Sequence, residues 1–206
     1  MSLSAAEVNE LKQAPAVDKV IPVVLHRWSP RAFADKAVSD ADLKTIFEAV
    51  RWTASSSNEQ PWRFLVGRQG SETYAKILGS LVEANQLWAS KAPVLILGAA
   101  KTHFTYNNAP NVAALYDLGA AAITLALQAA ELGLAAHQMA GFDHGKARAA
   151  FGIPEDFYLG AAIALGYQGD PASLPNDRML EQETRKRSRK ELSEFVLSGW
   201  GEAAQL

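Results

Sequence analysis

The sequence predicts an α+β fold, in which helices cover a central β-sheet and the C-terminal segment docks outside that core. Two observations lead to this class. Helical and strand-like patterns alternate along the 206 residues without the regular strand–helix–strand repeat of a parallel sheet. The C-terminal segment 191–206, ELSEFVLSGWGEAAQL, carries large apolar residues that have no obvious place in the core. On an isolated monomer such residues would be unusual, so they also suggest a partner chain.

The first predicted elements follow from capping residues and apolar spacing. Segment 1–14 is polar with a helical pattern. Ser39, followed three residues later by an aspartate, predicts the start of a helix whose apolar residues recur at spacings of three and four. That helix runs into a polar loop, which ends at a predicted strand over 62–67. Ser71 then begins a second predicted helix, and the continuous apolar run 92–100 is typical of a strand covered on both faces.

The middle of the chain predicts a loop followed by a long helix. Residues 102–111 mix polar and aromatic side chains without a period, so we expect a surface loop. The alanine-rich run from about 112 to 132 predicts a buried helix. Gly133 stands where a left-handed residue usually ends a helix.

The remaining elements complete one domain. Segments 134–142 and 158–167 predict two strands, joined by a short helix that starts at Asp143. After Pro171 the chain becomes polar, and we expect it to be extended up to the apolar tail. We find no repeat and no linker, so the whole chain, 1–206, is interpreted as a single domain.

Composition and charge narrow the class of protein. The formal net charge of -2 gives no overall field to attract nucleic acid or an anionic membrane. The absence of cysteine excludes disulfides, thiolate metal sites and thiol nucleophiles. The N-terminus lacks the apolar segment of a secretory signal, and polar residues interrupt the most apolar helix. We therefore expect a cytoplasmic protein that binds neither membrane nor nucleic acid.

Several well-known catalytic motifs are absent. The sequence contains no GxGxxG after a strand, no GxxxxGK[ST], no HExxH and no GxSxG. A Rossmann dinucleotide domain, a P-loop NTPase and a serine hydrolase are therefore not indicated. The four histidines lie far apart in the sequence, so we interpret them as surface or core residues and expect no metal site.

The segment HRWSPRAF, residues 26–33, combines two arginines and a serine at alternate positions. In an extended segment the side chains of Arg27, Ser29 and Arg31 would point the same way. Two guanidinium groups and a hydroxyl on one face would bind a phosphate well, because arginine donates forked, charge-assisted hydrogen bonds. A solvated basic turn before a helix is the alternative.

The segment TASSSNEQP, residues 53–61, is rich in uncharged donors and acceptors. Such side chains suit a neutral heterocycle or a sugar that needs many directed hydrogen bonds. The alternative is an ordinary helix end followed by a Ser/Asn turn. Pro61 and Trp62 make the exit of the loop rigid, as a binding loop requires.

Two further motifs are weaker by themselves. Gly141, after a predicted strand, would let a backbone N–H approach a ligand closely, although by itself the motif favours an ordinary strand-ending glycine. The basic run RKRSRK at 185–190 is a solvated charge run or a nucleic-acid patch in isolation. It lacks interleaved aromatic residues, which argues against nucleic acid.

Together the four motifs resemble the nitroreductase family of FMN-dependent oxidoreductases. The resemblance covers nearly the whole chain, from HRWSPRAF to RKRSRKELSEFVLSGW. Its most specific part is TASSSNEQPWRF, residues 53–64. There the family shows a small residue or proline, two serines, one variable residue, asparagine, one more residue, and then Gln-Pro-Trp.

The resemblance implies a homodimer with FMN in a groove between its subunits. It implies a mixed or antiparallel sheet flanked by helices, with the C-terminal tail exchanged between the subunits. The residues implied to contact the phosphate and ribityl chain from one subunit are Arg27, Trp28, Ser29, Arg31, Arg187 and Arg189. Those implied to reach the same flavin from the other subunit are Ser55, Ser56 and Asn58. Those implied at the edges of the ring system are Asn85, Gln138, Met139, Ala140 and Gly141, with a backbone N–H near flavin N5.

The resemblance also implies a ping-pong reaction. NAD(P)H would deliver hydride to flavin N5 and leave, and a small acceptor such as a nitroaromatic compound or a quinone would take its place. Because the flavin carries the chemistry, no side chain is expected to be a dominant catalytic residue. A donor that stacks on the flavin also needs no Rossmann motif.

The sequence departs from the family at two positions. Ala140 stands where some members have a glutamate that faces the flavin, and Trp28 stands where a basic residue or histidine often follows the first arginine. We expect acceptor specificity in a lid formed by His103, Phe104 and Tyr106, unless these are plain residues of a surface loop.

Two other functions stay open. An FMN-binding protein that stores or senses the flavin without turnover would use the same residues. An interaction module without flavin could dock through its basic tail, but it would leave the serine-rich segment unexplained.

Overall fold

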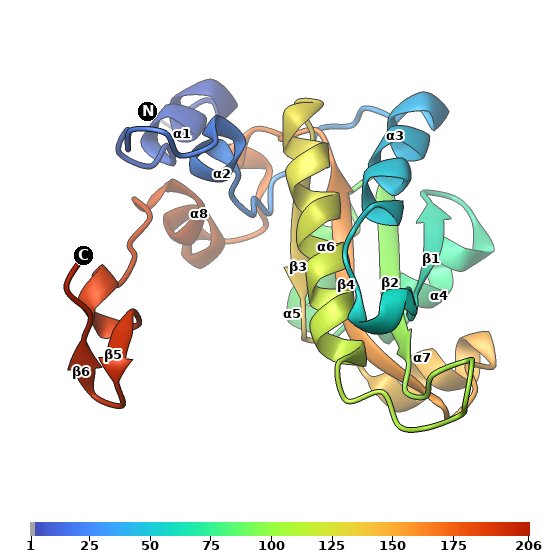
Figure 1. The fold of residues 1–206 in the computed structure, drawn as a ribbon. Helices are drawn as coiled ribbons and strands as arrows, with labels where there is room; N and C mark the ends of the chain where they lie inside the picture. Colours follow the sequence, from blue (N-terminus) through green and yellow to red (C-terminus); the bar gives the residue numbers. More distant parts are fainter. Residues whose placement is uncertain (1–2) are drawn as a thin grey trace.

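The computed structural model describes residues 3–206 and has a four-stranded antiparallel sheet at its centre (Figure 1). The strands are β1 Trp62–Arg68, β2 Val94–Lys101, β3 Ala135–Met139 and β4 Phe157–Gly166. Their order in the sheet is β1-β2-β4-β3, and each neighbouring pair is antiparallel. Strand β2 is buried along nearly its whole length, as its continuous apolar run predicts. Strand β3 lies at the edge, so one side of its backbone is not paired within the sheet.

Helices cover both faces of the sheet (Figure 1). They are α1 Ala5–Leu11, α2 Pro22–His26, α3 Asp40–Arg51, α4 Glu72–Ser80, α5 Glu83–Ala89, α6 Ala114–Glu131, α7 His144–Phe151 and α8 Asp177–Thr184. Ile46 of α3 and Leu125 of α6 belong to the apolar cluster on one face. Ile77 of α4 and Ala147 of α7 belong to the cluster on the other. The α+β class with a flanked sheet is therefore confirmed.

The capping residues expected from the sequence begin and end the helices. The side-chain oxygens of Ser39, Ser71 and Asp143 accept hydrogen bonds of 3.0, 3.1 and 2.8 Å from backbone N–H groups in the first turns of α3, α4 and α7. Gly133, with a φ of 72°, follows the end of α6 in the left-handed region. These local signals were sufficient because each depends on neighbouring residues only.

The expectation of an extended chain after Pro171 is wrong for residues 177–184, which form helix α8. This helix has no broad apolar stripe, and the side chain that it buries completely is Glu183. Its start is nevertheless encoded locally, since Asn176 Oδ1 accepts from the Met179 N–H at 2.9 Å. Helices α2 and α5 were also not predicted, because five and seven residues are too few to show a helical period.

The C-terminal tail lies outside the sheet. Its strands β5 Leu197–Gly199 and β6 Glu202–Ala203 form a small hairpin that extends from the side of the molecule where α8 lies (Figure 1). Phe195 and Trp200 are exposed over 60% and 101% of their reference areas. In this chain alone, the apolar side chains of the tail are therefore not buried. No helix within residues 3–206 is long and apolar enough to cross a bilayer.

Candidate functional site

The basic loop, defined as residues 27–31, lies directly after helix α2. Within it Arg27 Nη1 donates to Ser29 Oγ at 3.3 Å, so these two alternate side chains do meet. Arg187 reaches this loop from the far end of the sequence and donates from Nη1 to the Arg27 carbonyl at 2.8 Å. Its other terminal nitrogen donates to the carbonyl of Leu25. The two arginine motifs, separated by about 160 positions, thus share one place in the fold.

Arg27, Arg187 and Arg189 form a cation cluster. Burial lowers the pKa of Arg27, and the charge of Arg189 lowers it further. The pKa of Arg187 is lowered by burial and then by the charges of Arg189 and Arg27. Within residues 3–206, no carboxylate lies within 4.0 Å of these arginines, and the buried Nε of Arg187 has no hydrogen-bond partner. Cations gathered without a counter-ion suit a ligand with several anionic oxygens, such as a phosphate.

A buried carboxylate holds the end of the basic loop. Glu183 of α8 is completely buried and accepts from the Arg31 N–H at 2.9 and 3.0 Å and from the Ala32 N–H at 3.0 Å. Lys12, after α1, is 5% exposed and donates to the carbonyls of Gln182 and Arg185 at 3.1 and 2.6 Å. These contacts connect the N-terminal helix, the loop and α8, which lie together beside the sheet (Figure 1).

A histidine joins the basic loop to the edge strand. His137 of β3 lies with Nδ1 2.8 Å from the Pro30 carbonyl, and its ring packs on Trp88 with centroids 4.6 Å apart. Burial lowers the pKa of His137 to about 4, so the imidazole is neutral at pH 7. The contact to a carbonyl oxygen then requires Nδ1 to carry the proton. The loop is thereby fixed along β3.

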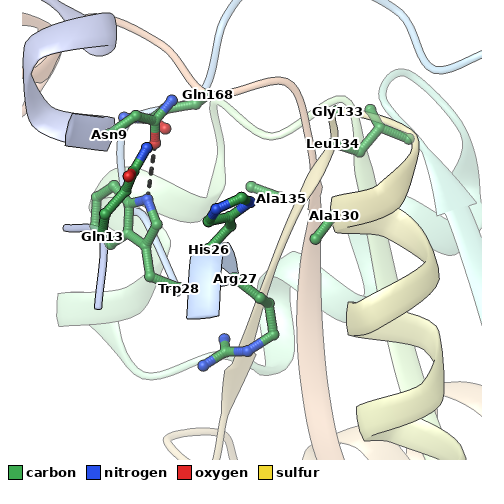
Figure 2. A pocket seen from close by; sticks show the side chains of 10 residues that line it. All are labelled: Asn9, Gln13, His26, Arg27, Trp28, Ala130, Gly133, Leu134, Ala135 and Gln168. Carbon is green, nitrogen blue, oxygen red and sulfur yellow. Dashed lines mark hydrogen bonds between the residues drawn. The ribbon is translucent and has the colours of Figure 1, made fainter. Parts of the chain in front are cut away.

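Trp28 faces the N-terminal helix. Its Nε1 donates to Asn9 Oδ1 at 2.9 Å, and the Lys12 Nζ lies 4.7 Å from the centroid of its ring. Trp28 and Arg27 border a cavity of about 270 Å³ next to the first residue of β3. Figure 2 shows the Arg27 side chain directed away from His26 within this cavity, and the bond between Trp28 and Asn9. The indole of Trp28 therefore holds α1 in place, which leaves its backbone as the part suited to a ligand.

The far end of β3 brings together two residues that the sequence assigns to the ring edges. Asn85 Nδ2 of α5 donates to the Gly141 carbonyl at 3.0 Å. A Cβ on Gly141 would lie 2.6 Å from that nitrogen, so only glycine permits this approach. Ala140 is exposed next to Gly141, whereas the side chain of Met139 is buried in the core. Of Met139, only the backbone can face a ligand. The side chain of Gln138 turns to the other face of the sheet, where its Nε2 donates to the Ala122 carbonyl of α6 at 3.2 Å.

The edge strand connects the two ends of the candidate site. At about 3.3 Å per residue, the run from Ala135 to Gly141 covers roughly 20 Å. The cation cluster lies near its start and the Asn85–Gly141 contact lies beyond its end. This arrangement suits an elongated ligand with an anionic group at one end and a flat polar ring at the other.

The serine loop, defined as residues 53–61, is held mainly by its own contacts. Three non-glycine residues in it have left-handed backbones, with φ of 53° at Ser57, 53° at Asn58 and 50° at Gln60. The Gln60 N–H donates to Ser55 Oγ at 3.0 Å, and Gln60 Nε2 donates to Asn58 Oδ1 at 3.2 Å. Strained backbone of this kind is concentrated at functional sites, where it fixes the direction of side chains.

Two carboxylates connect the serine loop to its surroundings. The buried Asp117 of α6 accepts from the Ser56 N–H at 3.1 Å. Glu59 accepts from the backbone N–H and the hydroxyl of Thr105 at 3.0 and 3.1 Å. Thr105 lies in the loop proposed as a lid, between Phe104 and Tyr106, whose ring centroids are 5.3 Å apart. The lid residues therefore lie beside the serine loop; His103 pairs with Pro110 at the base of the same loop.

The structure divides the candidate residues into two groups. The basic loop, the tail arginines, Asn85 and the end of β3 are connected along one edge of the sheet. The serine loop, which follows α3, lies on the other side of α6 (Figure 1). The sequence did not indicate Glu183, Lys12, His137, Asp117 or Glu59 as supporting residues. Each acts on a segment at least 40 positions away, so no local pattern could identify it.

The fold and the site define an α+β protein in which a cation cluster and the Asn85–Gly141 contact lie along the edge of an antiparallel sheet. Comparison with known proteins gives the family: the nitroreductase family model matches residues 24–86 and 68–167, and the chain belongs to that family.

Individual relatives agree with this assignment. An uncharacterised 15.4 kDa protein of Mycolicibacterium smegmatis is 36% identical over 68% of this chain and 97% of its own length. A protein of Xanthomonas oryzae pv. oryzae, named as a proposed NADH dehydrogenase/NAD(P)H nitroreductase, is 32% identical over 69% of this chain and 81% of its own. The crystal structure of an oxidoreductase containing FMN superposes with a TM-score of 0.83 at 34% identity, covering 97% of this chain and 98% of that one.

Proposed function

We propose that the protein is an FMN-dependent oxidoreductase that uses NAD(P)H to reduce small acceptors such as nitroaromatic compounds or quinones. The observation that carries the proposal is the cation cluster of Arg27, Arg187 and Arg189, which has no carboxylate partner within residues 3–206. The FMN contained in the similar oxidoreductase, at 34% identity over nearly the full chain, supports the choice of ligand.

The residues present fit the parts of FMN. The phosphate would be held by the guanidinium groups of the cluster and by Arg31 and Ser29, because a dianion needs several charge-assisted donors. The orphaned Nε of Arg187 offers one such donor. The ring edge offers carbonyl oxygens and ring nitrogens, which the amide of Asn85 and the backbone after β3 can match.

FMN, when bound, would supply hydride transfer and electron transfer to the acceptor. The chain then needs to bind and orient the cofactor and to shape the space above it. The small side chains of Ala140 and Gly141 place no charge at the end of β3, and a backbone N–H there would favour electron density that develops at the ring. We therefore assign no side chain as a catalytic acid or base.

A homodimer would complete the site. The serine loop lies on the far side of α6 from the basic loop, so Ser55, Ser56 and Asn58 would contact the flavin of the partner subunit. Exposed apolar residues on α6, Leu115 and Ile123 at 45% and 42%, and the apolar tail support a second copy as the partner. Exchange of the tail between subunits would bury Phe195 and Trp200.

The first experiment is the visible spectrum of the purified protein, with NADPH or NADH then added in the absence of oxygen. An absorption band at about 450 nm that bleaches with either donor would support the proposal that the protein is a reducible flavoprotein. A flavin band that resists both donors would favour storage or sensing of FMN. A colourless protein that also fails to bind added FMN would overturn the proposal. The cytoplasmic location stays a prediction of the sequence.

A further inference from the structure

We propose that Glu183 is a positioning residue that holds both halves of the phosphate site, the basic loop and the arginines of the tail, in register. The inference rests on the proposed binding of FMN. Glu183 itself would not touch the cofactor. It would determine where the donors of the phosphate site point.

Glu183 holds the end of the basic loop. Glu183 Oε1 accepts from two successive backbone N–H groups, those of Arg31 and Ala32, at 2.9 and 3.0 Å. Its Oε2 accepts a second contact from the Arg31 N–H at 3.0 Å. One carboxylate thereby fixes the backbone at Arg31, from which the side chain projects. Because Ser29 and Arg27 lie two and four residues earlier, the exit of the whole basic loop is set at this point.

Glu183 also lies where the chain enters the tail. Glu183 lies in the last turn of α8, which ends at Thr184 and leads directly into the basic run. Lys12 donates to the carbonyls of Gln182 and Arg185 on either side of it, and so fixes the direction in which the chain leaves the helix. Three residues after Thr184, Arg187 returns to the Arg27 carbonyl at 2.8 Å. A shift of α8 would therefore move Arg187 and Arg189 relative to the loop.

Stability alone does not explain a carboxylate at this position. Glu183 is completely buried, and burial raises its pKa against the opposing effects of the two N–H groups, Arg31 and Lys12. A buried charge commonly costs as much in lost hydration as its partners return, and a neutral amide could also accept from backbone N–H groups. The geometry that Glu183 imposes on the two arginine segments gives the position a functional reason.

The test compares FMN with riboflavin, which has the same ring and ribityl chain but no phosphate. We would measure the dissociation constant of each for the wild-type protein and for Glu183→Gln. Glutamine keeps one oxygen for the N–H groups but places an amide where Oε2 faces Arg31. Glu181→Gln is the matched control, because Glu181 is exposed on the same helix.

The expected result is a loss specific to the phosphate. Glu183→Gln should raise the dissociation constant of FMN about tenfold, which corresponds to the loss of one charge-assisted hydrogen bond to the phosphate. The dissociation constant of riboflavin should change less than about threefold. Glu181→Gln should change neither. Equal losses for FMN and riboflavin, or an unchanged preference for FMN, would overturn the positioning role.

A second variant keeps the proposal testable if Glu183→Gln does not fold. Lys12→Met removes the two bonds to carbonyls around Glu183 while retaining an unbranched side chain. This variant should also weaken the binding of FMN more than the binding of riboflavin. An unchanged preference for FMN over riboflavin would count against the proposal. A wild-type protein that binds both flavins equally would instead refute the phosphate site itself, which distinguishes failure of the proposed function from failure of this inference.

Discussion

The two polar loops that follow helices α2 and α3 are held in opposite ways. The basic loop is fixed from outside, by Glu183 of α8, His137 of β3 and Arg187 of the tail. The serine loop is fixed largely from within, by left-handed backbone and by short-range bonds such as that from Gln60 to Ser55. Its long-range supports are the contacts with Asp117 and with Thr105.

The difference indicates different tasks. A phosphate needs several cations close together, and cations repel one another, so buried anchors from separate segments must hold them in place. A loop that meets a ligand across a subunit boundary instead needs a stable shape of its own. We therefore expect variants of the basic loop to affect ligand binding most and variants of the serine loop to affect local stability most.

The strongest test removes two arginines of the cation cluster. The double variant Arg27→Ala/Arg189→Ala should lower the affinity for FMN roughly a thousandfold or more, because each guanidinium supplies charge-assisted bonds to the phosphate. This loss corresponds to about 4 kcal/mol of binding free energy. The thermal midpoint of the flavin-free protein should not fall, since the cluster contains only like charges. Isothermal titration and thermal unfolding measure the two effects. The exposed pair Lys44→Ala/Arg51→Ala changes the net charge equally and should leave FMN binding intact.

The next test uses pH to break the link between the basic loop and β3. The pKa of His137 is about 4 in the folded protein, against about 6.5 in an unfolded chain. Between these values the unfolded chain binds the extra proton, so acidification from pH 6.5 to 4 should lower the free energy of unfolding by up to about 3 kcal/mol. The contribution is complete above pH 6.5 and is lost as the pH falls.

The matched variants isolate that contribution. The free energy of unfolding is measured at pH 7 and at pH 4. In His137→Gln, the difference between the two values should be smaller than in the wild type by the contribution of His137. His144→Gln, at an exposed histidine, should retain it. If wild type and His137→Gln lose stability in parallel on acidification, the neutral imidazole of His137 is not the cause.

The same contrast explains how much the sequence could predict. The serine loop is evident from its local sequence. The helix ends at Ser39, Ser71, Asp143 and Gly133 are also evident, because capping depends on neighbouring residues only. Helix α8 was missed because the residue that it buries is a glutamate, whose partners lie about 150 positions away. Long-range polar anchors have no sequence period, so the supports of the basic loop became visible only in the fold.

The long-range support of the serine loop can be tested at Asp117. Asp117→Asn keeps an oxygen for the Ser56 N–H but removes the charge that strengthens this bond and interacts with the N-terminus of α6. Denaturant unfolding should show a loss of about 1–2 kcal/mol. Asp177→Asn, at an exposed aspartate in the first turn of α8, should cost less than about 0.5 kcal/mol. Equal losses would mean that the burial of Asp117 adds nothing to the loop.

The smallest expected effect concerns the left-handed backbone within the serine loop. Ser57 has a φ of 53°, whereas the neighbouring Ser56 has no positive φ, so glycine should act differently at the two positions. Ser57→Gly relieves strain of about 1 kcal/mol, which offsets the greater entropy of glycine in the unfolded chain. Ser56→Gly brings the entropy cost without that relief. The first variant should therefore be more stable than the second by about 1 kcal/mol in denaturant unfolding. If the two are equally destabilised, the left-handed residues do not hold the shape of the loop, and its rigidity must come from Asp117 and Glu59.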